Sequence, residues 1–193
     1  RFTMKPFFYK LLKLDEKASK RLALEHPPQA IEFFFKLISH SCDSWYWLVG
    51  LVALWILSKP SGKEIAVTFS FVLGFLAIVV LLIKYFFKRA RPEGDWGQIY
   101  RINDPHSFPS GHAARAMAIV IISISFFSGW AVLLILVWAL LVGYSRVALK
   151  VHYLSDVLVG FLFGAVFAFA SLSVFNVLID NFPKIARFLF HGF

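Results

Sequence analysis

The sequence predicts an all-α, integral-membrane helix bundle with about six transmembrane helices, and two observations support this fold class. Of the 193 residues, 59% are hydrophobic and the mean hydropathy is +0.72, whereas soluble domains are about 45–50% apolar. Apolar segments of bilayer length recur along the chain, and none alternates with the period of two that a membrane barrel requires. A bundle follows, because helices satisfy their own backbone hydrogen bonds in lipid.

Five of the expected transmembrane segments are clear, namely residues 44–58, 65–87, 111–127, 130–149 and 153–179. Residues 29–41 form a possible sixth, short segment, but they contain Glu32 and Lys36, whereas a spanning helix needs about 20 predominantly apolar residues. Residues 59–63 and 128–129 have the Pro, Gly and Ser content of connections between helices.

The rest of the chain is divided as follows. Residues 1–3 precede Met4, and we expect them to be foreign to the native protein. Residues 4–26 alternate lysines with Phe and Leu, which predicts an amphipathic helix lying in the membrane interface; the alternative is a solvated helix packed on the bundle. Residues 27–182 form the expected transmembrane domain, and residues 183–193 a short C-terminal tail.

The formal net charge of +9 fits either a phosphate-binding site or basic residues facing anionic lipid. Nucleic acid is not an expected partner, because no basic stripe lies on a water-soluble scaffold. Cys42 is the only cysteine, so an internal disulfide and a cysteine-based zinc site are excluded.

Three short motifs carry the chemistry. They are Lys84-x6-Arg91-Pro92, Pro109-Ser110-Gly111-His112 and Ser145-Arg146-x5-His152-x3-Asp156. The first lies at the end of a predicted span, the second at the start of the next, and the third at the following hairpin. Up-and-down connectivity therefore places all three at one membrane face.

These residue types suit phosphoryl transfer, which needs a nucleophile, a proton donor and fixed positive charge. His152 and Asp156 share a face if their segment is helical, so the carboxylate can orient the imidazole. His112 can then protonate the leaving oxygen. A capping Ser110 and the backbone N–H of Gly111 suit an anion at a helix N-terminus.

Three cations complete the expected phosphate site. Arg91 and Arg146 offer guanidinium forks and Lys84 adds a point charge. We expect Lys88 and Arg89 to be interfacial residues without a part in the site.

Other polar and small residues receive lesser roles. Arg115 could brace the site or pair with Asp104. The spacing Gly160-x3-Gly164 indicates a close helix contact. No chemistry is expected of His40, His106 and His191.

The three motifs resemble the signature of the type 2 phosphatidic acid phosphatase (PAP2) family, whose phosphate site is shared with vanadium haloperoxidases and bacterial class A acid phosphatases. Every defining position is matched between residues 84 and 156. The resemblance implies no metal or other cofactor, and it implies His152 as the nucleophile that forms a phosphohistidine. It implies Asp156 as the partner of His152 and His112 as the general acid, and as phosphate ligands Lys84, Arg91, Ser110, Gly111 and Arg146.

The expected function is metal-independent hydrolysis of a terminal phosphate from a bacterial envelope lipid, with the bilayer and this lipid as partners. Undecaprenyl diphosphate, phosphatidylglycerophosphate and the 1-phosphate of lipid A are the candidate substrates. The polar loop 92–108 is expected to read the headgroup, through Trp96, Tyr100 and Arg101. The alternatives are a lipid phosphotransferase with the same phosphohistidine, and a non-catalytic anionic-lipid binder or transporter.

The expected location is a bacterial inner membrane, with several passages and the active site facing the periplasm. This orientation depends on residues 29–41 crossing the bilayer. The face opposite the motifs would then carry the basic N-terminus together with Lys59, Lys63, Lys184 and Arg187, and the positive-inside rule would make that face cytoplasmic.

Overall fold

The computed structural model describes residues 6–94, 96, 102 and 104–191. Its regular secondary structure is helical throughout the described residues, which confirms the all-α fold class. The helices are α1 (Pro6–Leu22), α2 (Gln29–His40), α3 (Ser44–Leu57), α4 (Pro60–Phe87), α6 (Gly111–Ser123), α7 (Gly129–Ala148), α8 (Leu154–Asn181) and α9 (Pro183–His191).

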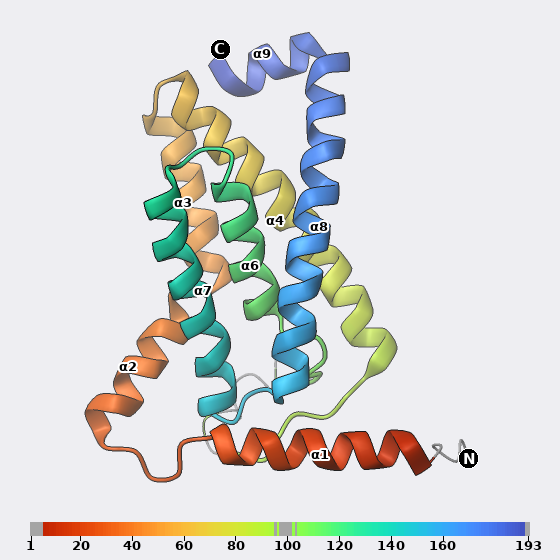
Figure 1. The fold of residues 1–193 in the computed structure, drawn as a ribbon. Coiled ribbons are helices and arrows are strands. Elements are labelled where there is room, and N and C mark those ends of the chain that lie inside the picture. The colour runs from red at the N-terminus through yellow and green to blue at the C-terminus, as the bar shows by residue number, and fades with distance from the viewer. Residues whose placement is uncertain (1–5, 95, 97–101, 103, 192–193) are drawn as a thin grey trace.

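The bundle runs up and down between two ends (Figure 1). The chain rises through α2 and then α3, descends through α4, rises through α6, descends through α7 and rises through α8. In the described part, α2 and α3 follow one another in a single passage, interrupted at residues 41–43. Residues 29–41, the short sixth segment of the sequence analysis, therefore contribute helix α2 to the start of this passage.

Three helices in the described residues are long and apolar enough to cross a membrane alone: α4, α7 and α8. The other two expected spans are shorter, with 14 residues in α3 and 13 in α6. At about 1.5 Å per residue, α6 is only ~20 Å long. It lies between α4, α7 and α8 and buries most of its side chains, so it forms the centre of the bundle.

Small residues let α8 approach the backbone of α6. A Cβ on Gly164 would lie 2.1 Å from the carbonyl oxygen of Ala114, and one on Gly160 would lie 2.7 Å from that of Ser110. Neither position has room for a side chain. The close helix contact expected from the Gly160-x3-Gly164 spacing is confirmed, and it fixes the start of α8 against the start of α6.

The outward faces of the long helices are apolar. Leu82 on α4, Leu134 on α7 and Leu162 on α8 are each more than 60% exposed. Such a continuous apolar surface is unfavourable in water and suits hydrocarbon. Together with the three span-length helices, it identifies a multi-pass membrane protein.

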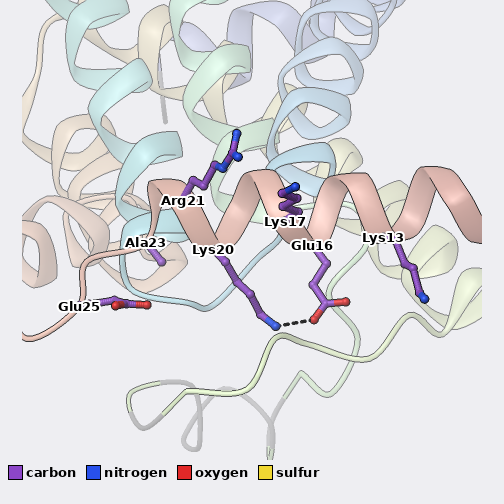
Figure 2. A pocket seen from close by; sticks show the side chains of 7 residues that line it. All are labelled: Lys13, Glu16, Lys17, Lys20, Arg21, Ala23 and Glu25. Carbon is purple, nitrogen blue, oxygen red and sulfur yellow. Dashed lines mark hydrogen bonds and ion pairs between the residues drawn. The ribbon is translucent and has the colours of Figure 1, made fainter.

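Helix α1 lies across the end of the bundle that carries the three motifs (Figure 1). Its basic residues are Lys10, Lys13, Lys17, Lys20 and Arg21, and Figure 2 shows Lys13 and Lys20 on one side of the helix and Arg21 on another. Lys20 pairs with Glu16 at 2.7 Å. These basic residues of the N-terminal helix therefore lie at the motif end, whereas we expected them at the opposite end.

The opposite end is closed by α9, where a tail was expected. The indole Nε1 of Trp55 donates a hydrogen bond to the carbonyl oxygen of Leu189 at 2.8 Å. This contact joins α9 to the end of α3, and α9 also packs on α4.

Candidate active site

All three motifs meet at one end of the bundle, as the up-and-down topology predicts. A cavity of about 290 Å³ at this end is lined by residues of every motif. Six of the eight predicted site residues are among its lining: Lys84, Arg91, Gly111, His112, Arg146 and His152. Ser110 and Asp156 lie behind it, and neither side chain is exposed.

His152 lies in the short connection between α7 and α8, two residues before α8 begins. Its backbone N–H and that of Val151 both donate to the carbonyl oxygen of Arg146 at 3.0 Å, which folds the connection back on the end of α7. Its Nε2 lies 3.1 Å from a terminal nitrogen of Arg91. The side chain is therefore buried beside the Arg91 guanidinium, only 2% exposed.

The environment of His152 favours the neutral imidazole. Burial lowers the pKa of His152 well below its ordinary value of 6.5, and the positive charges of Arg91, Arg146 and Lys84 lower it further. A neutral imidazole keeps the lone pair that a nucleophile needs.

Asp156 is the third residue of α8 and does not share a helix with His152. Its Oδ2 lies 3.6 Å from Nδ1 of His152 and accepts the backbone N–H of Tyr153 at 3.0 Å, which caps the helix. Its Oδ1 accepts from Arg89 at 2.7 Å. The carboxylate thus faces Nδ1 of His152 and caps the helix that follows this histidine.

Arg89 is a site residue that the sequence analysis missed. It pairs with Asp156 and also with Asp15 of α1, at 2.6 Å, and its guanidinium stacks on the ring of Tyr153 at 4.1 Å. The interpretation of Arg89 as an interfacial residue was wrong. It joins α1 to the base of the site, and only the tertiary approach of α1 reveals this.

Lys84 and Arg91 converge on the carboxylate of Asp104. Its Oδ2 lies 2.7 Å from the Lys84 ammonium and 2.9 Å from a terminal nitrogen of Arg91. Lys84 also donates to the carbonyl oxygen of His106 at 2.8 Å. An anionic group is therefore held between these two cations, which is the arrangement that an equatorial phosphate oxygen requires.

Arg146 is fully buried and donates to the hydroxyl of Ser39 on α2. Ser110 caps α6, as predicted: its hydroxyl accepts the backbone N–H of Ala113 at 3.4 Å. The N–H of Ser110 donates to the carbonyl oxygen of Asp156 at 2.9 Å. The second motif is thus bonded directly to the third, and the N-terminus of α6 faces the cavity with its partial positive charge.

His112 contacts a carboxylate from a part of the chain outside the motifs. Its Nε2 lies 2.7 Å from Oδ1 of Asp43, and Oδ2 of Asp43 lies 2.7 Å from Nδ1 of His40. The sequence analysis assigned no chemistry to His40 and did not single out Asp43.

Arg115 braces the site and does not pair with Asp104. It donates to the carbonyl oxygen of Cys42 and to the hydroxyl of Ser44. The first of its two expected roles is therefore the one that the structure supports.

Of the three residues expected to read the headgroup, the structure describes Trp96 alone, and Tyr100 and Arg101 lie outside the described residues. The Trp96 ring centroid lies 5.8 Å from the guanidinium of Arg146 and 5.5 Å from the ring of His40. Trp96 therefore lies beside Arg146, one of the residues that line the cavity.

Two further cavities adjoin the site. One, of about 350 Å³, lies between α3 and α4; its apolar walls include Trp47, Leu51 and Leu73, and it shares Ser44, Leu73, Ala77 and Arg115 with the catalytic cavity. The other, of about 440 Å³, lies against α1 and reaches His152 and Arg91 past Glu16, Lys20 and Lys150. The site is thus approached by an apolar groove and by a polar cavity.

Comparisons with known proteins found a related sequence and related folds. An undecaprenyl-diphosphatase from Sulfolobus acidocaldarius is 28% identical over 134 residues, covering 67% of this chain and 64% of the relative. The chain thus spans slightly less than two thirds of that relative's length.

Solved structures share the fold. LpxE from Aquifex aeolicus superimposes with a TM-score of 0.68 at 23% identity, covering 83% of this chain and 95% of the other. The transmembrane PAP2-type phosphatidylglycerolphosphate phosphatase of Bacillus subtilis superimposes with a TM-score of 0.71 at 24% identity, covering 86% and 87%. The PAP2 superfamily profile matches residues 65–180, and because that match takes in more than half of the sequence and all three motifs, this chain belongs to the PAP2 superfamily.

Proposed function

We propose that the protein is a metal-independent lipid phosphatase that acts through a phosphohistidine at His152. The observation that carries this proposal is the convergence of Lys84, Arg91 and Arg146 around His152 and His112 in one cavity. Fixed cations stabilise the charge that spreads over the phosphoryl oxygens in the transition state. The two histidines supply the nucleophile and the proton donor.

In the first step, Nε2 of His152 attacks phosphorus and the bond from phosphorus to the lipid oxygen breaks. Asp156 lies on the Nδ1 side of the ring, which leaves Nε2 as the attacking atom, and Arg91 beside Nε2 is placed to bind a phosphoryl oxygen. His112 gives its proton to the departing oxygen.

In the second step, water attacks the phosphohistidine, and the phosphorus–nitrogen bond breaks. His112, now neutral, takes the proton of this water, and inorganic phosphate leaves. The polar cavity against α1 supplies a route for water to His152 that does not pass through the apolar groove.

The α3–α4 groove supports a lipid as the substrate. Its walls are mainly apolar, and it continues into the catalytic cavity past Leu73 and Ala77. An acyl or prenyl chain bound there would leave its phosphate beside the cations. The candidate lipids are undecaprenyl diphosphate, phosphatidylglycerophosphate and the 1-phosphate of lipid A, and the names of two similar proteins include the first and second of these.

Transfer of the phosphoryl group to a lipid or sugar acceptor is a second candidate, since it would use the same phosphohistidine. The water-accessible cavity at His152 favours hydrolysis. An increase in turnover with added acceptor would identify a transferase.

We further propose that the protein resides in a bacterial inner membrane with its site on the outer side. The positive-inside rule no longer supports this orientation, because the basic residues of α1 lie at the motif end. The support is the chemistry of the candidate substrates, which are envelope lipids.

The function is tested by phosphate release from purified protein in detergent with excess EDTA, using the three candidate lipids and phosphatidic acid. We expect release that survives EDTA and is lost in His152→Ala. His26→Asn is the matched control, because it removes a histidine that does not line the catalytic cavity, and Asn tolerates the left-handed backbone at this position. Loss of release in EDTA, or full activity of His152→Ala, would contradict the proposal.

A further inference from the structure

The interruption between α2 and α3, residues 41–43, is held in place from several sides. The indole Nε1 of Trp138 donates to the Ser41 hydroxyl at 2.9 Å, and Arg115 donates to groups of Cys42 and Ser44 on either side of Asp43. The Cys42 side chain is fully buried. The backbone at Asp43 is therefore fixed against α6 and α7.

This fixed backbone presents Asp43 to His112. One carboxylate oxygen lies 2.7 Å from Nε2 of His112, and the other lies 2.7 Å from Nδ1 of His40. The Asp43 side chain is 26% exposed and that of His112 is 14% exposed. A close hydrogen bond in such a partly buried position is stronger than one on an open surface.

An ionised carboxylate accepts hydrogen bonds only, so the contact with Asp43 places a proton on Nε2 of His112. The ring orientation is then fixed, and in the proposed mechanism the opposite nitrogen, Nδ1, exchanges the proton with the reacting groups. When His112 is protonated, the negative charge of Asp43 stabilises the imidazolium. Both effects serve an acid that must give a proton to a poor leaving group.

We propose that Asp43 is a positioning residue for the general acid His112, supplied by the α2–α3 interruption. The proposal rests on the proposed function and deepens it, since it assigns to α2 and α3 a part in the chemistry of the lipid leaving group. Asp43 acts through His112 and touches no reacting atom.

The alternative is that Asp43 has only a structural role and holds α3 against α6. Loss of a structural contact would lower the activity on every substrate equally, because it would disturb the whole site. Loss of a residue that positions the acid slows the reaction of a substrate only if its leaving group needs a proton to depart. Two substrates with the same alkyl chain separate these roles: a long-chain alkyl phosphate, whose alkoxide must be protonated, and a nitrophenyl phosphate carrying that chain, whose phenolate leaves unaided.

The test compares wild type, Asp43→Asn and His112→Ala on this pair. For Asp43→Asn with the alkyl phosphate, we expect kcat to fall about 100-fold, the lower range for loss of general acid catalysis. KM should stay within about twofold, because Asp43 does not contact the substrate. With the nitrophenyl phosphate, the rate of the first step, measured as the burst of nitrophenol release, should stay within about threefold of wild type, since acid catalysis is then dispensable in that step. In His112→Ala the first step should show the same selective loss, and hydrolysis of the phosphohistidine, for which His112 is the base, should stop with both substrates.

Glu32→Gln is the matched control, because it also neutralises a carboxylate on this segment. In the described contacts, the Glu32 side chain pairs only with Lys36. The activity of this variant on both substrates should equal that of wild type. Equal losses on both substrates in Asp43→Asn, or no loss on either, would overturn the role of Asp43. A wild-type protein inactive on both substrates would instead contradict the phosphatase function on which the role depends.

Discussion

The cations proposed to bind phosphate also lower the pKa of His152, the proposed nucleophile. Arg91, Arg146 and Lys84 surround a buried imidazole, and burial and the three charges all lower the pKa of His152 below 6.5. A positive charge nearby disfavours the protonated ring and leaves the neutral ring unaffected. In the proposed mechanism, the side chains that bind the substrate therefore also keep the attacking nitrogen of His152 unprotonated.

This arrangement sets the pH dependence. Because the pKa of His152 in the protein is below 6.5, the acid limb of kcat/KM should lie below pH 6.5, and activity should be lost only as pH falls through the lowered pKa. Lys84→Met removes one positive charge, so its acid limb should move to higher pH. Ionisation of the substrate is measured separately by phosphorus NMR and divided out. An acid limb at or above pH 6.5 in wild type would contradict the assignment.

At the residue scale, the motifs identified six residues that line one cavity, because phosphate chemistry restricts the choice of side chain and spacing. They did not identify Asp43 or Arg89. Asp43 lies 69 positions from His112, and Arg89 lies 74 positions from Asp15. Aspartate and arginine are common near helix ends, so only the folded chain distinguishes these two from ordinary surface charges.

At the scale of elements, the contact between α6 and α8 fixes the distance between the second and third motifs. A Cβ on Gly164 would lie 2.1 Å from a backbone carbonyl oxygen of α6, which cannot move away without moving the helix. Gly164→Ala should therefore destabilise the protein by about 1–3 kcal/mol, as overpacking typically does, and reduce activity because the N-terminus of α6 shifts.

Thermal unfolding in detergent measures this effect. Gly50→Ala on α3 is the matched control, because no atom lies within 4 Å of the added Cβ and alanine favours the helix. Its unfolding temperature should be unchanged or raised. An unchanged unfolding temperature for Gly164→Ala would show that α6 and α8 can separate freely.

The long helices could be predicted from the sequence, whereas the bounds and docking of the short helices could not. α4, α7 and α8 follow from their uninterrupted apolar sequence. The interruption of α2 and α3 at residues 41–43 depends on Arg115 and Trp138, which bind it from elsewhere in the chain. The docking of α1 likewise depends on Asp15, which accepts the backbone N–H of Ser155 at 2.9 Å. A hydropathy profile does not predict such contacts between distant parts of the chain.

At the scale of the whole molecule, the single passage made by α2 and α3 places α1 beside the site and α9 at the far end (Figure 1). Orientation in the membrane is measurable because Cys42 is buried and is the only cysteine. Lys13→Cys reports on the motif end and Lys184→Cys on the opposite end. With an impermeant maleimide on intact cells, we expect labelling of Lys13→Cys alone. Labelling of Lys184→Cys alone would place the active site on the cytoplasmic side.

The central claim is that a covalent phosphohistidine forms at His152. The most direct measurement uses His112→Gln, which keeps the nucleophile but cannot activate water, so that the intermediate accumulates. The variant is mixed with the radiolabelled nitrophenyl phosphate, quenched in alkali, where the phosphorus–nitrogen bond persists, and digested for peptide analysis. We predict nearly stoichiometric label on His152 and none after the further change His152→Ala. Label on another residue, or turnover without any label, would contradict the account.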